Sequence, residues 1–181
     1  SGNRVMTSTD GITWTSRTSA ADYNWTSVNW SPTLSLFAAV SNTGTGNRVM
    51  TSPDGINWTL RTTPSDLNWT SIEWNSNLNY FLAVSPSGSM RSSNGTTWTL
   101  RSFATNNNWN SVVFSSDINT FAAVASSGTG NRATIYSLAA VPSGSYSSVA
   151  WSANQSKAVA VASSGTNRSM VTSDLITWTN A

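Results

Sequence analysis

Short apolar segments, separated by polar turns rich in glycine and asparagine, recur along the whole chain. The segment Phe37–Val40 is apolar at every position, which suits a strand buried on both faces. Arg48–Ser52 and Ile56–Arg61 mix polar groups with large apolar residues, as expected of strands nearer the surface. No stretch shows the 3.6-residue period of a long amphipathic helix. The pattern therefore predicts an all-β fold with almost no helix.

The apolar pattern belongs to a repeat in the sequence itself. Gly-Asn-Arg-Val-Met-Thr-Ser-x-Asp-Gly-Ile-x-Trp-Thr occurs at Gly2–Thr15 and again 44 residues later, at Gly46–Thr59. The apolar segment recurs at Phe81–Val84, Phe121–Val124 and Ala158–Val161. A period of about 40–45 residues that contains several short strands is typical of a propeller blade. We predict a β-propeller of four-stranded antiparallel blades, with about 4.5 repeats of 37–44 residues.

Each repeat is expected to supply four strands, exemplified by Trp69–Trp74, Tyr80–Ser85, Arg48–Ser52 and Ile56–Arg61. The strand type of Phe37–Val40 should lie near the propeller centre, where its two alanines fit a crowded space. Residues 1–181 are then one propeller. It consists of an outer hairpin of a partial blade in 1–24 and four full blades in 25–68, 69–108, 109–145 and 146–181.

The first outer hairpin has no inner hairpin before it, so the repeats cannot close a ring by pairing among themselves. A two-stranded hairpin with open edges is marginally stable and attracts other strands. We expect the chain to be a segment of a longer propeller, or its hairpin to dock on another subunit in a homo-oligomer, or the hairpin to rearrange.

A turn of defined chemistry separates the two outer strands of a repeat. In Ser52-Pro53-Asp54-Gly55, proline presets the first turn position, aspartate accepts backbone N–H bonds and glycine takes a positive φ. Related turns begin at Ser8 and Ser92, the latter with Asn94 in place of aspartate. We expect these side chains to hold the turns rather than a metal, because each stands alone in its own hairpin.

These turns resemble the Asp box of sialidase-like propellers, Ser-x-Asp-x-Gly-x-Thr-Trp, with one residue fewer between aspartate and glycine. The short form Ser-x-Asp-Gly-x-x-Trp is similar to repeats in bacterial, phage and large-DNA-virus proteins. The resemblance implies a structural propeller repeat and no particular enzyme. The residues that carry it are Ser8, Asp10, Gly11, Trp14, Ser52, Asp54, Gly55, Trp58, Asn94, Gly95, Trp98, Asp174 and Trp178. The last copy lacks the glycine, and no copy lies between Arg132 and Gly144.

The chain offers few groups for catalysis. It has no histidine and no cysteine, which excludes Cys/His zinc sites and Ser-His or Cys-His nucleophiles. Asp22 and Asp66 occupy equivalent repeat positions, whereas Glu73 stands where the other repeats have Asn29, Val113 and Ala150. Because a glycosidase needs two carboxylates, or a tyrosine with an acidic partner, we expect no enzyme activity, no cofactor and no metal.

Arginine and asparagine recur at blade spacing and suggest a binding surface. Guanidinium and amide donors can bind sugar hydroxyls beside an exposed aromatic ring. The candidate ligand-binding residues are Asn47, Arg48, Arg61, Asn131, Arg132, Asn167 and Arg168. In the alternative, structural interpretation, the arginines pair with Asp22 or Asp66 or cap loop carbonyls.

The amino-acid composition limits the classes of partner that the chain is expected to bind. Only 9% of residues are charged, and serine, threonine and asparagine provide the polar surface, which suggests an extracellular, cell-surface or virion protein. The net charge is +2 and the arginines are dispersed, so no basic stripe for nucleic acid is present. No apolar run approaches the ~20 residues that cross a bilayer, so we expect no membrane insertion.

The leading functional hypothesis is a non-enzymatic, lectin-like recognition module that binds carbohydrate at repeated sites between blades. The expected partner is a glycan or a protein surface. One alternative is a structural propeller of a virion or surface assembly. Another is a recently amplified or engineered repeat protein without a ligand, since Gly2–Thr15 and Gly46–Thr59 differ at two positions only.

Overall fold

The computed structural model describes residues 2–101, 107–128, 133–134, 144–152, 154–165, 168–173 and 179–180. Within this part of the chain the structure consists of strands and turns, without a helix. The all-β prediction is therefore confirmed.

The strands form one hairpin and four larger antiparallel sheets, each ordered as in the sequence. The N-terminal hairpin is β1 (Val5–Thr7) and β2 (Thr15–Arg17). Blade 1 is β3 (Trp25–Ser31), β4 (Leu36–Ser41), β5 (Val49–Ser52) and β6 (Thr59–Arg61). Blade 2 is β7 (Ser71–Asn75), β8 (Tyr80–Ser85), β9 (Gly88–Ser92) and β10 (Thr99–Arg101). Blade 3 is β11 (Trp109–Ser115), β12 (Thr120–Ala125) and β13 (Ala133–Thr134). Blade 4 is β14 (Gly144–Ser152), β15 (Lys157–Gly165), β16 (Ser169–Thr172) and β17 (Thr179–Asn180).

Several strand boundaries differ from the expectation. β5 begins at Val49 rather than Arg48, and β7 spans Ser71–Asn75 rather than Trp69–Trp74. The outer strand expected at Ile56–Arg61 begins only at Thr59, because Ile56, Asn57 and Trp58 belong to the preceding turn. The last inner hairpin begins at Gly144, two residues before the boundary expected at Tyr146.

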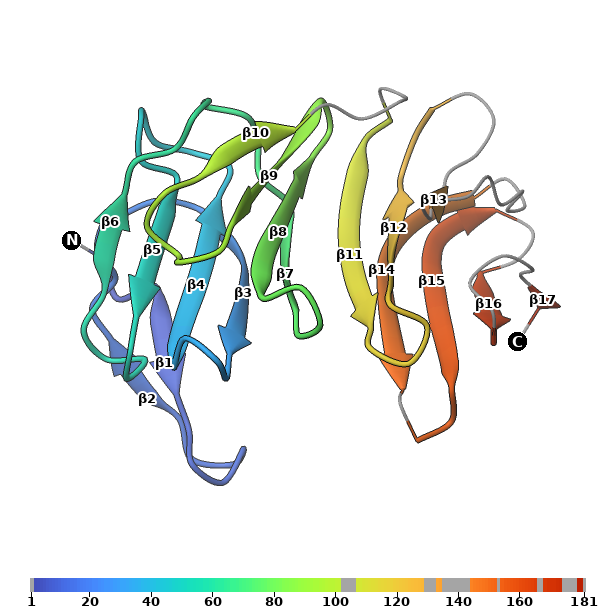
Figure 1. Cartoon of the computed structure of the whole chain (residues 1–181), viewed down its shortest axis with the longest axis horizontal. Coiled ribbons are helices and arrows are strands. Elements are labelled where there is room, and N and C mark those ends of the chain that lie inside the picture. Colours follow the sequence, from blue (N-terminus) through green and yellow to red (C-terminus); the bar gives the residue numbers. More distant parts are fainter. Residues whose placement is uncertain are drawn as a thin grey trace.

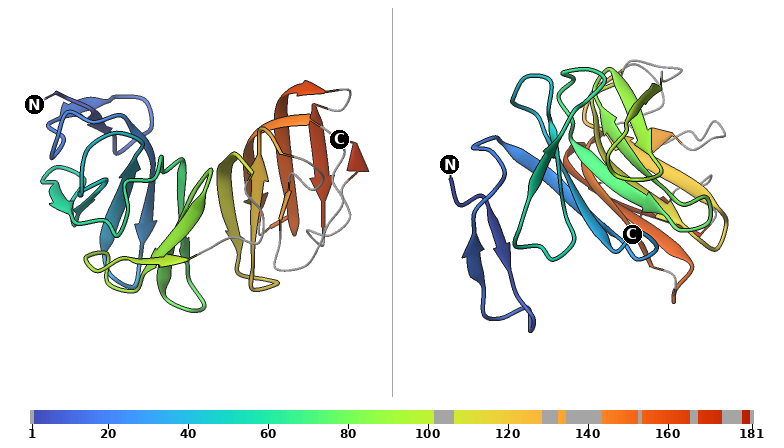
Figure 2. Two further views of the ribbon diagram at one scale, coloured as in Figure 1. Left: turned by 90° about the horizontal axis from the view of Figure 1, so that it is seen from above. Right: turned by 60° about the vertical axis from the view of Figure 1, so that its left-hand side comes forward.

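The sheets stand side by side in an open arc (Figures 1 and 2). The N-terminal hairpin and blade 1 occupy one end of the long axis and blade 4 occupies the other. The first strands of successive blades, β3, β7, β11 and β14, are neighbours along the arc. This is the arrangement of propeller blades around an axis.

Repeated hydroxyl bonds join the first strand of each blade to that of the next. Ser27 Oγ accepts from the Ile72 N–H at 3.2 Å, and Ser71 Oγ accepts from the Val112 N–H at 3.2 Å. Thr26 Oγ1 donates to the Trp69 carbonyl at 2.8 Å, and Thr70 Oγ1 donates likewise to the Trp109 carbonyl at 2.7 Å. We call this set of bonds the inner seam.

The apolar core lies between the blades. Trp69, Trp74 and Phe81 of blade 2 are buried against Ala38 and Val40 of blade 1. The alanines expected near the centre are fully buried, as the crowding argument predicts. The blade framework therefore places the box-containing outer hairpins at the periphery and β3, β7, β11 and β14 at the centre.

Candidate functional site

The turns at Ser8–Trp14, Ser52–Trp58 and Ser92–Trp98, here called box turns, share one set of bonds. In the second turn, Asp54 Oδ1 accepts from the N–H groups of Ile56 and Asn57, both at 2.8 Å. Ser52 Oγ accepts from the Gly55 N–H at 2.8 Å, and Gly55 has a φ of 74°. Asp10 and Asn94 accept the corresponding bonds in the other two turns. The expected turn chemistry is confirmed at these three copies, while Asp174 and Trp178 lie outside the described residues.

The box-turn carboxylates are held in their ionised form. The Asn57 backbone N–H, together with the Asn57 side chain and the Ile56 N–H, keeps the pKa of Asp54 well below its ordinary value. The backbone N–H groups of Thr13 and Ile12 do the same for the pKa of Asp10. A carboxylate that is saturated with backbone donors is a poor general acid or base at neutral pH.

Arg48, a candidate ligand-binding residue, cross-links loops instead. Its side chain is only 13% exposed, and its Nε donates to the Gly44 carbonyl at 2.8 Å. Its Nη1 donates to the carbonyls of Asn42 and Leu67 at 3.1 Å. Asp66 lies 3.7 Å from Nε, and the equivalent Arg4 pairs with Asp22 at 2.6 Å. These contacts are those of the structural interpretation.

The structure describes some of the other candidate ligand-binding residues. Arg61 Nε donates to Thr51 Oγ1 at 2.8 Å, and the Asn47 side chain accepts from the Tyr23 hydroxyl at 3.0 Å. Arg168 is exposed before β16, and its carbonyl accepts from the Ala162 N–H at 2.8 Å. Asn131, Arg132 and Asn167 lie outside the described residues. Asn47, Arg48 and Arg61 belong to the outer hairpin of blade 1 and Arg168 to blade 4, so the described candidates do not form one site.

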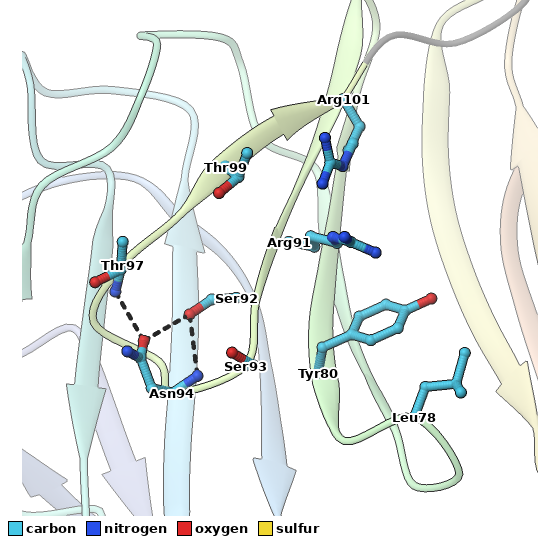
Figure 3. Close-up of a pocket in the computed structure, with 9 residues that line it drawn as sticks. All are labelled: Leu78, Tyr80, Arg91, Ser92, Ser93, Asn94, Thr97, Thr99 and Arg101. Atoms are coloured by element: carbon cyan, nitrogen blue, oxygen red, sulfur yellow. Dashed lines mark hydrogen bonds between the residues drawn. The ribbon is translucent and has the colours of Figure 1, made fainter.

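A pocket that the sequence analysis missed opens on the outer strands of blade 2 (Figure 3). Its volume is ≈ 500 Å³, and we call it the Tyr80 pocket. It is lined by Leu78, Tyr80, Arg91, Ser92, Ser93, Asn94, Thr97, Thr99 and Arg101. These are one aromatic ring, two guanidinium groups and several hydroxyl and amide groups, with no acidic residue among them.

A single replacement in the repeat creates the cationic side of this pocket. In the N-terminal hairpin and in blade 1, the arginine that ends the outer strand donates to a threonine, as Arg17 does to Thr7 at 3.0 Å. Blade 2 has Arg91 at this threonine position, so Arg101 has no hydroxyl to bond there. The Arg91 guanidinium lies 5.6 Å from the centroid of the Tyr80 ring, a cation–π distance. In the described part of the chain neither arginine forms an ion pair.

A sequence signal for this site exists. The third strand of the repeat contains Met-Thr at Met6-Thr7 and Met50-Thr51, but Met-Arg at Met90-Arg91. A residue that departs from the repeat consensus does not make the side-chain contact that its equivalents share. By this criterion the sequence marks Arg91 as a candidate functional residue, just as it marks Glu73.

Glu73 lies at the inner seam rather than in the Tyr80 pocket. Asn29 Nδ2 of blade 1 donates to Glu73 Oε2 at 2.7 Å. Burial raises the pKa of this carboxyl to about 7, against the opposing effect of a bond from the Phe114 backbone N–H. Glu73 therefore joins three neighbouring first strands.

Two features are absent from the described residues. They contain no group of three or more acidic side chains placed to share a metal ion. They also contain no helix with the length and apolarity needed to cross a membrane.

Known structures resemble the chain in fold. No protein-family model and no curated protein matches it. Among solved structures it is similar to YCF48 bound to D1 peptide, with a TM-score of 0.61, 13% identity and 93% of this chain and 58% of that chain covered. The β-propeller domain of Cps50 (Swd1) from Myceliophteria thermophila gives a TM-score of 0.55 at 15% identity, over 91% of this chain and 57% of that one. The Niastella koreensis GH74 enzyme gives 0.57 at 16% identity, over 86% of this chain and 24% of that one.

These similarities establish the propeller fold. The chain spans less than two thirds of the length of each of these structures. The identities of 13–16% carry no information on activity or ligand.

Proposed function

We propose that this chain is a non-enzymatic recognition module and that it binds an acidic carbohydrate in the Tyr80 pocket. The observation that carries the proposal is the pair Arg91 and Arg101 beside the Tyr80 ring, in a pocket without a lining acid. We also propose that the chain is related to the Asp-box repeat family, because three box turns share the bonds that its consensus residues suit.

The pocket has the chemistry that acidic sugars need. Guanidinium groups bind carboxylate or sulfate through charge-assisted hydrogen bonds. An aromatic face packs against the C–H surface of a sugar ring, and the hydroxyls of Thr97 and Thr99 can bond ring hydroxyls. The pocket is open to solvent, which suits the end of a glycan chain.

This proposal places the binding site at other residues of the repeat than those predicted from the sequence. Arg48 and Arg61, two of the residues that the sequence predicts for ligand binding, already donate to carbonyls or to Thr51. A ligand that recruits them would have to break these bonds, whereas Arg91 and Arg101 are exposed. The proposed site therefore belongs to blade 2 and is not repeated in blade 1.

The placement of the acids supports binding rather than hydrolysis. Asp54 holds its turn, and Asp66 accepts from the Gly46 N–H at 2.7 Å. Asp22 is paired with Arg4, and Glu73 bonds Asn29 at the inner seam. A glycosidase needs two carboxylates that flank the bond to be cut, and no acid lines the Tyr80 pocket.

A second candidate is recognition of an acidic protein segment at the same pocket. The solved structure of YCF48 is that of the protein bound to D1 peptide, which supports peptide recognition as the second candidate. Aspartate or glutamate side chains would bind the same two guanidinium groups.

A glycan array probed with the folded chain tests the proposal, with acidic glycans, their neutral counterparts and acidic peptides on one surface. The wild-type chain should bind acidic glycans, and Arg91→Thr should lose at least about tenfold in affinity because one guanidinium is removed. Arg61→Ala is the matched control, because Arg61 is the blade 1 equivalent of Arg101 and does not line the Tyr80 pocket, and this variant should bind as the wild type does.

Three outcomes contradict the proposal: no glycan binding, a preference for neutral glycans, or unchanged binding by Arg91→Thr. Binding of acidic peptides alone would favour the second candidate.

A further inference from the structure

We propose that a groove between the N-terminal hairpin and blade 1 is a docking site for a β-hairpin that is not among residues 1–181. The groove has a volume of ≈ 540 Å³, and its apolar lining is Met6, Trp14, Val28, Phe37 and Ile56; we call it the hairpin groove. The proposed occupant resembles the first two strands of this chain's own blades, and it would pair with β1.

The first observation is an unpaired strand. In blades 1, 2 and 4 the third strand, β5, β9 or β16, lies between two neighbours, and β13 pairs with β12. In the described part of the chain β1 pairs with β2 alone. The edge of β1 that corresponds to the paired edge of β5 thus presents backbone donors and acceptors for a further strand.

The second observation is the exposure of apolar residues whose equivalents are buried. Met6 is 62% exposed, whereas Met50 at the same repeat position is 1% exposed. Trp14 is 53% exposed and its equivalent Trp98 only 7%. Val28 is 56% exposed and its equivalent Ile72 only 2%. All three exposed residues line the hairpin groove, so one missing neighbour accounts for them.

The third observation is the continuity of the inner seam. The N–H groups of Ile72 and Val112 each donate to a serine of the preceding first strand, and the carbonyls of Trp69 and Trp109 each accept from a threonine there. The equivalent groups of β3, the Val28 N–H and the Trp25 carbonyl, have no such partner in the described part of the chain. A first strand with Trp-Thr-Ser would continue the seam, as Trp25-Thr26-Ser27 does toward blade 2.

The pairing inside the blades specifies the second strand of the occupant. Phe37 stands opposite Ser52, and Ala39 stands opposite Met50. The Phe37 ring lies 6.3 Å from that of Trp58, and Phe81 and Trp98 show the same spacing in blade 2. Opposite Ser8 and Met6, the occupant therefore needs phenylalanine and alanine, in a strand of the form Phe-x-Ala-Val.

A complete second copy of the chain does not meet this requirement. In a copy, β4 already pairs with β5 and β8 with β9, so these second strands have no free edge for β1. The occupant is a hairpin with Trp-Thr-Ser and Phe-x-Ala-Val that has no outer strands of its own. Its binding adds strands to a sheet edge, a known mode of peptide recognition.

The test uses a fluorescent peptide of residues 24–42, which spans β3 and β4, added to the full-length protein. Fluorescence anisotropy should show saturable one-to-one binding, and hydrogen exchange should show slower exchange of the β1 amides in the complex. Met6→Lys should weaken binding by at least about tenfold, because a charge is placed in the apolar groove. Ile118→Lys is the matched control, since Ile118 is an exposed apolar residue of the β11–β12 turn, and it should bind as the wild type does.

The proposal is overturned if the peptide does not saturate, or if Met6→Lys binds as tightly as wild type. It is also overturned if a peptide carrying Phe37→Asp and Ala39→Asp binds equally well. A dimer of the chain with protected β1 amides, formed without peptide, would identify a second copy as the occupant and would likewise overturn it. Glycan binding at the Tyr80 pocket has no part in any of these readouts.

Discussion

At the scale of the residue, the type of side chain limits which interactions it can form. The neighbouring side chains then decide whether it is free to form them with a ligand. Arg61 and Arg101 end equivalent strands, but Arg61 donates to Thr51, whereas blade 2 has Arg91 in place of that threonine. The same arginine is therefore a structural link in blade 1 and part of a cationic pocket in blade 2.

The box turn provides a prediction on stability. Asp54→Ala removes the oxygen that accepts from Ile56 and Asn57, so the melting temperature should fall. Asp54→Asn should melt close to wild type at neutral pH, because Asn94 accepts the same bonds in blade 2. Thermal denaturation followed by circular dichroism measures both, and equal melting of the two variants would contradict the assigned role.

The same aspartate links stability to acid pH. Backbone N–H groups, of which that of Asn57 has the largest effect, keep the pKa of Asp54 in the folded protein below its value of 3.8 in an unfolded chain. The contribution to stability is therefore present above that value and is lost as the pH falls toward the folded-state pKa. Asp54→Asn should show a smaller loss of stability between neutral and acid pH than wild type.

Glu73 predicts the opposite pH dependence. Burial raises its pKa from 4.5 to about 7, so its contribution to stability is present below pH 4.5 and is lost as the pH rises through 7. At 1.36 kcal/mol per pKa unit, the loss is about 3 kcal/mol. Urea denaturation at pH 5 and pH 8 should show this loss of stability in the wild type and no such loss in Glu73→Gln. The exposed Asp117→Asn is the control and should retain it; a loss of equal size in Glu73→Gln and wild type would refute the link.

At the scale of the element, the inner seam connects blades that share no sheet. Each bond uses a hydroxyl of one first strand and a backbone group of the next, so it depends on where the strands stand relative to each other. The repeat of serine at equivalent positions is what makes the same bond recur.

The seam can be tested at Ser71. Ser71→Ala leaves the buried Val112 N–H without its acceptor at 3.2 Å, which should lower the free energy of unfolding by ~1–3 kcal/mol. Chemical denaturation measures the change. The exposed Ser116→Ala controls for loss of a hydroxyl and should leave stability unaltered within about 0.5 kcal/mol; a comparable effect at both positions would argue against the seam.

At the scale of the whole molecule, the open arc divides equivalent elements into covered and uncovered ones. The N-terminal hairpin carries nearly the same sequence as the outer strands of blade 1, yet its large apolar residues are exposed. Sequence identity therefore does not produce equal stability along the arc.

Hydrogen exchange should show this inequality. Amides of β1 and β2 should exchange before those of β5 and β6, because the hairpin lacks the strand that buries Met50 in blade 1. Mass spectrometry of peptic fragments from each hairpin compares near-identical sequences, so intrinsic exchange rates nearly cancel. Equal protection of the two hairpins would be inconsistent with the open arc.

The sequence by itself determined the fold class, the repeat and the box turns. These depend on local physics: alternation of side chains along a strand, glycine at positive φ and a side-chain oxygen within three residues of its donors. Local reasoning was wrong at Ile56–Trp58, which were assigned to a strand, because the Asp54 carboxylate draws the Ile56 and Asn57 amides into the turn.

Only the tertiary structure decided which functional groups are available. Arg48 is enclosed by carbonyls from Asn42, Gly44 and Leu67, and no local pattern reveals that the last of these reaches it. Burial of Glu73 and exposure of Val28 likewise depend on whether a neighbouring blade stands beside them. Contacts between residues far apart in sequence set desolvation and hydrogen-bond competition, and these determine whether a charged or apolar side chain can meet a ligand.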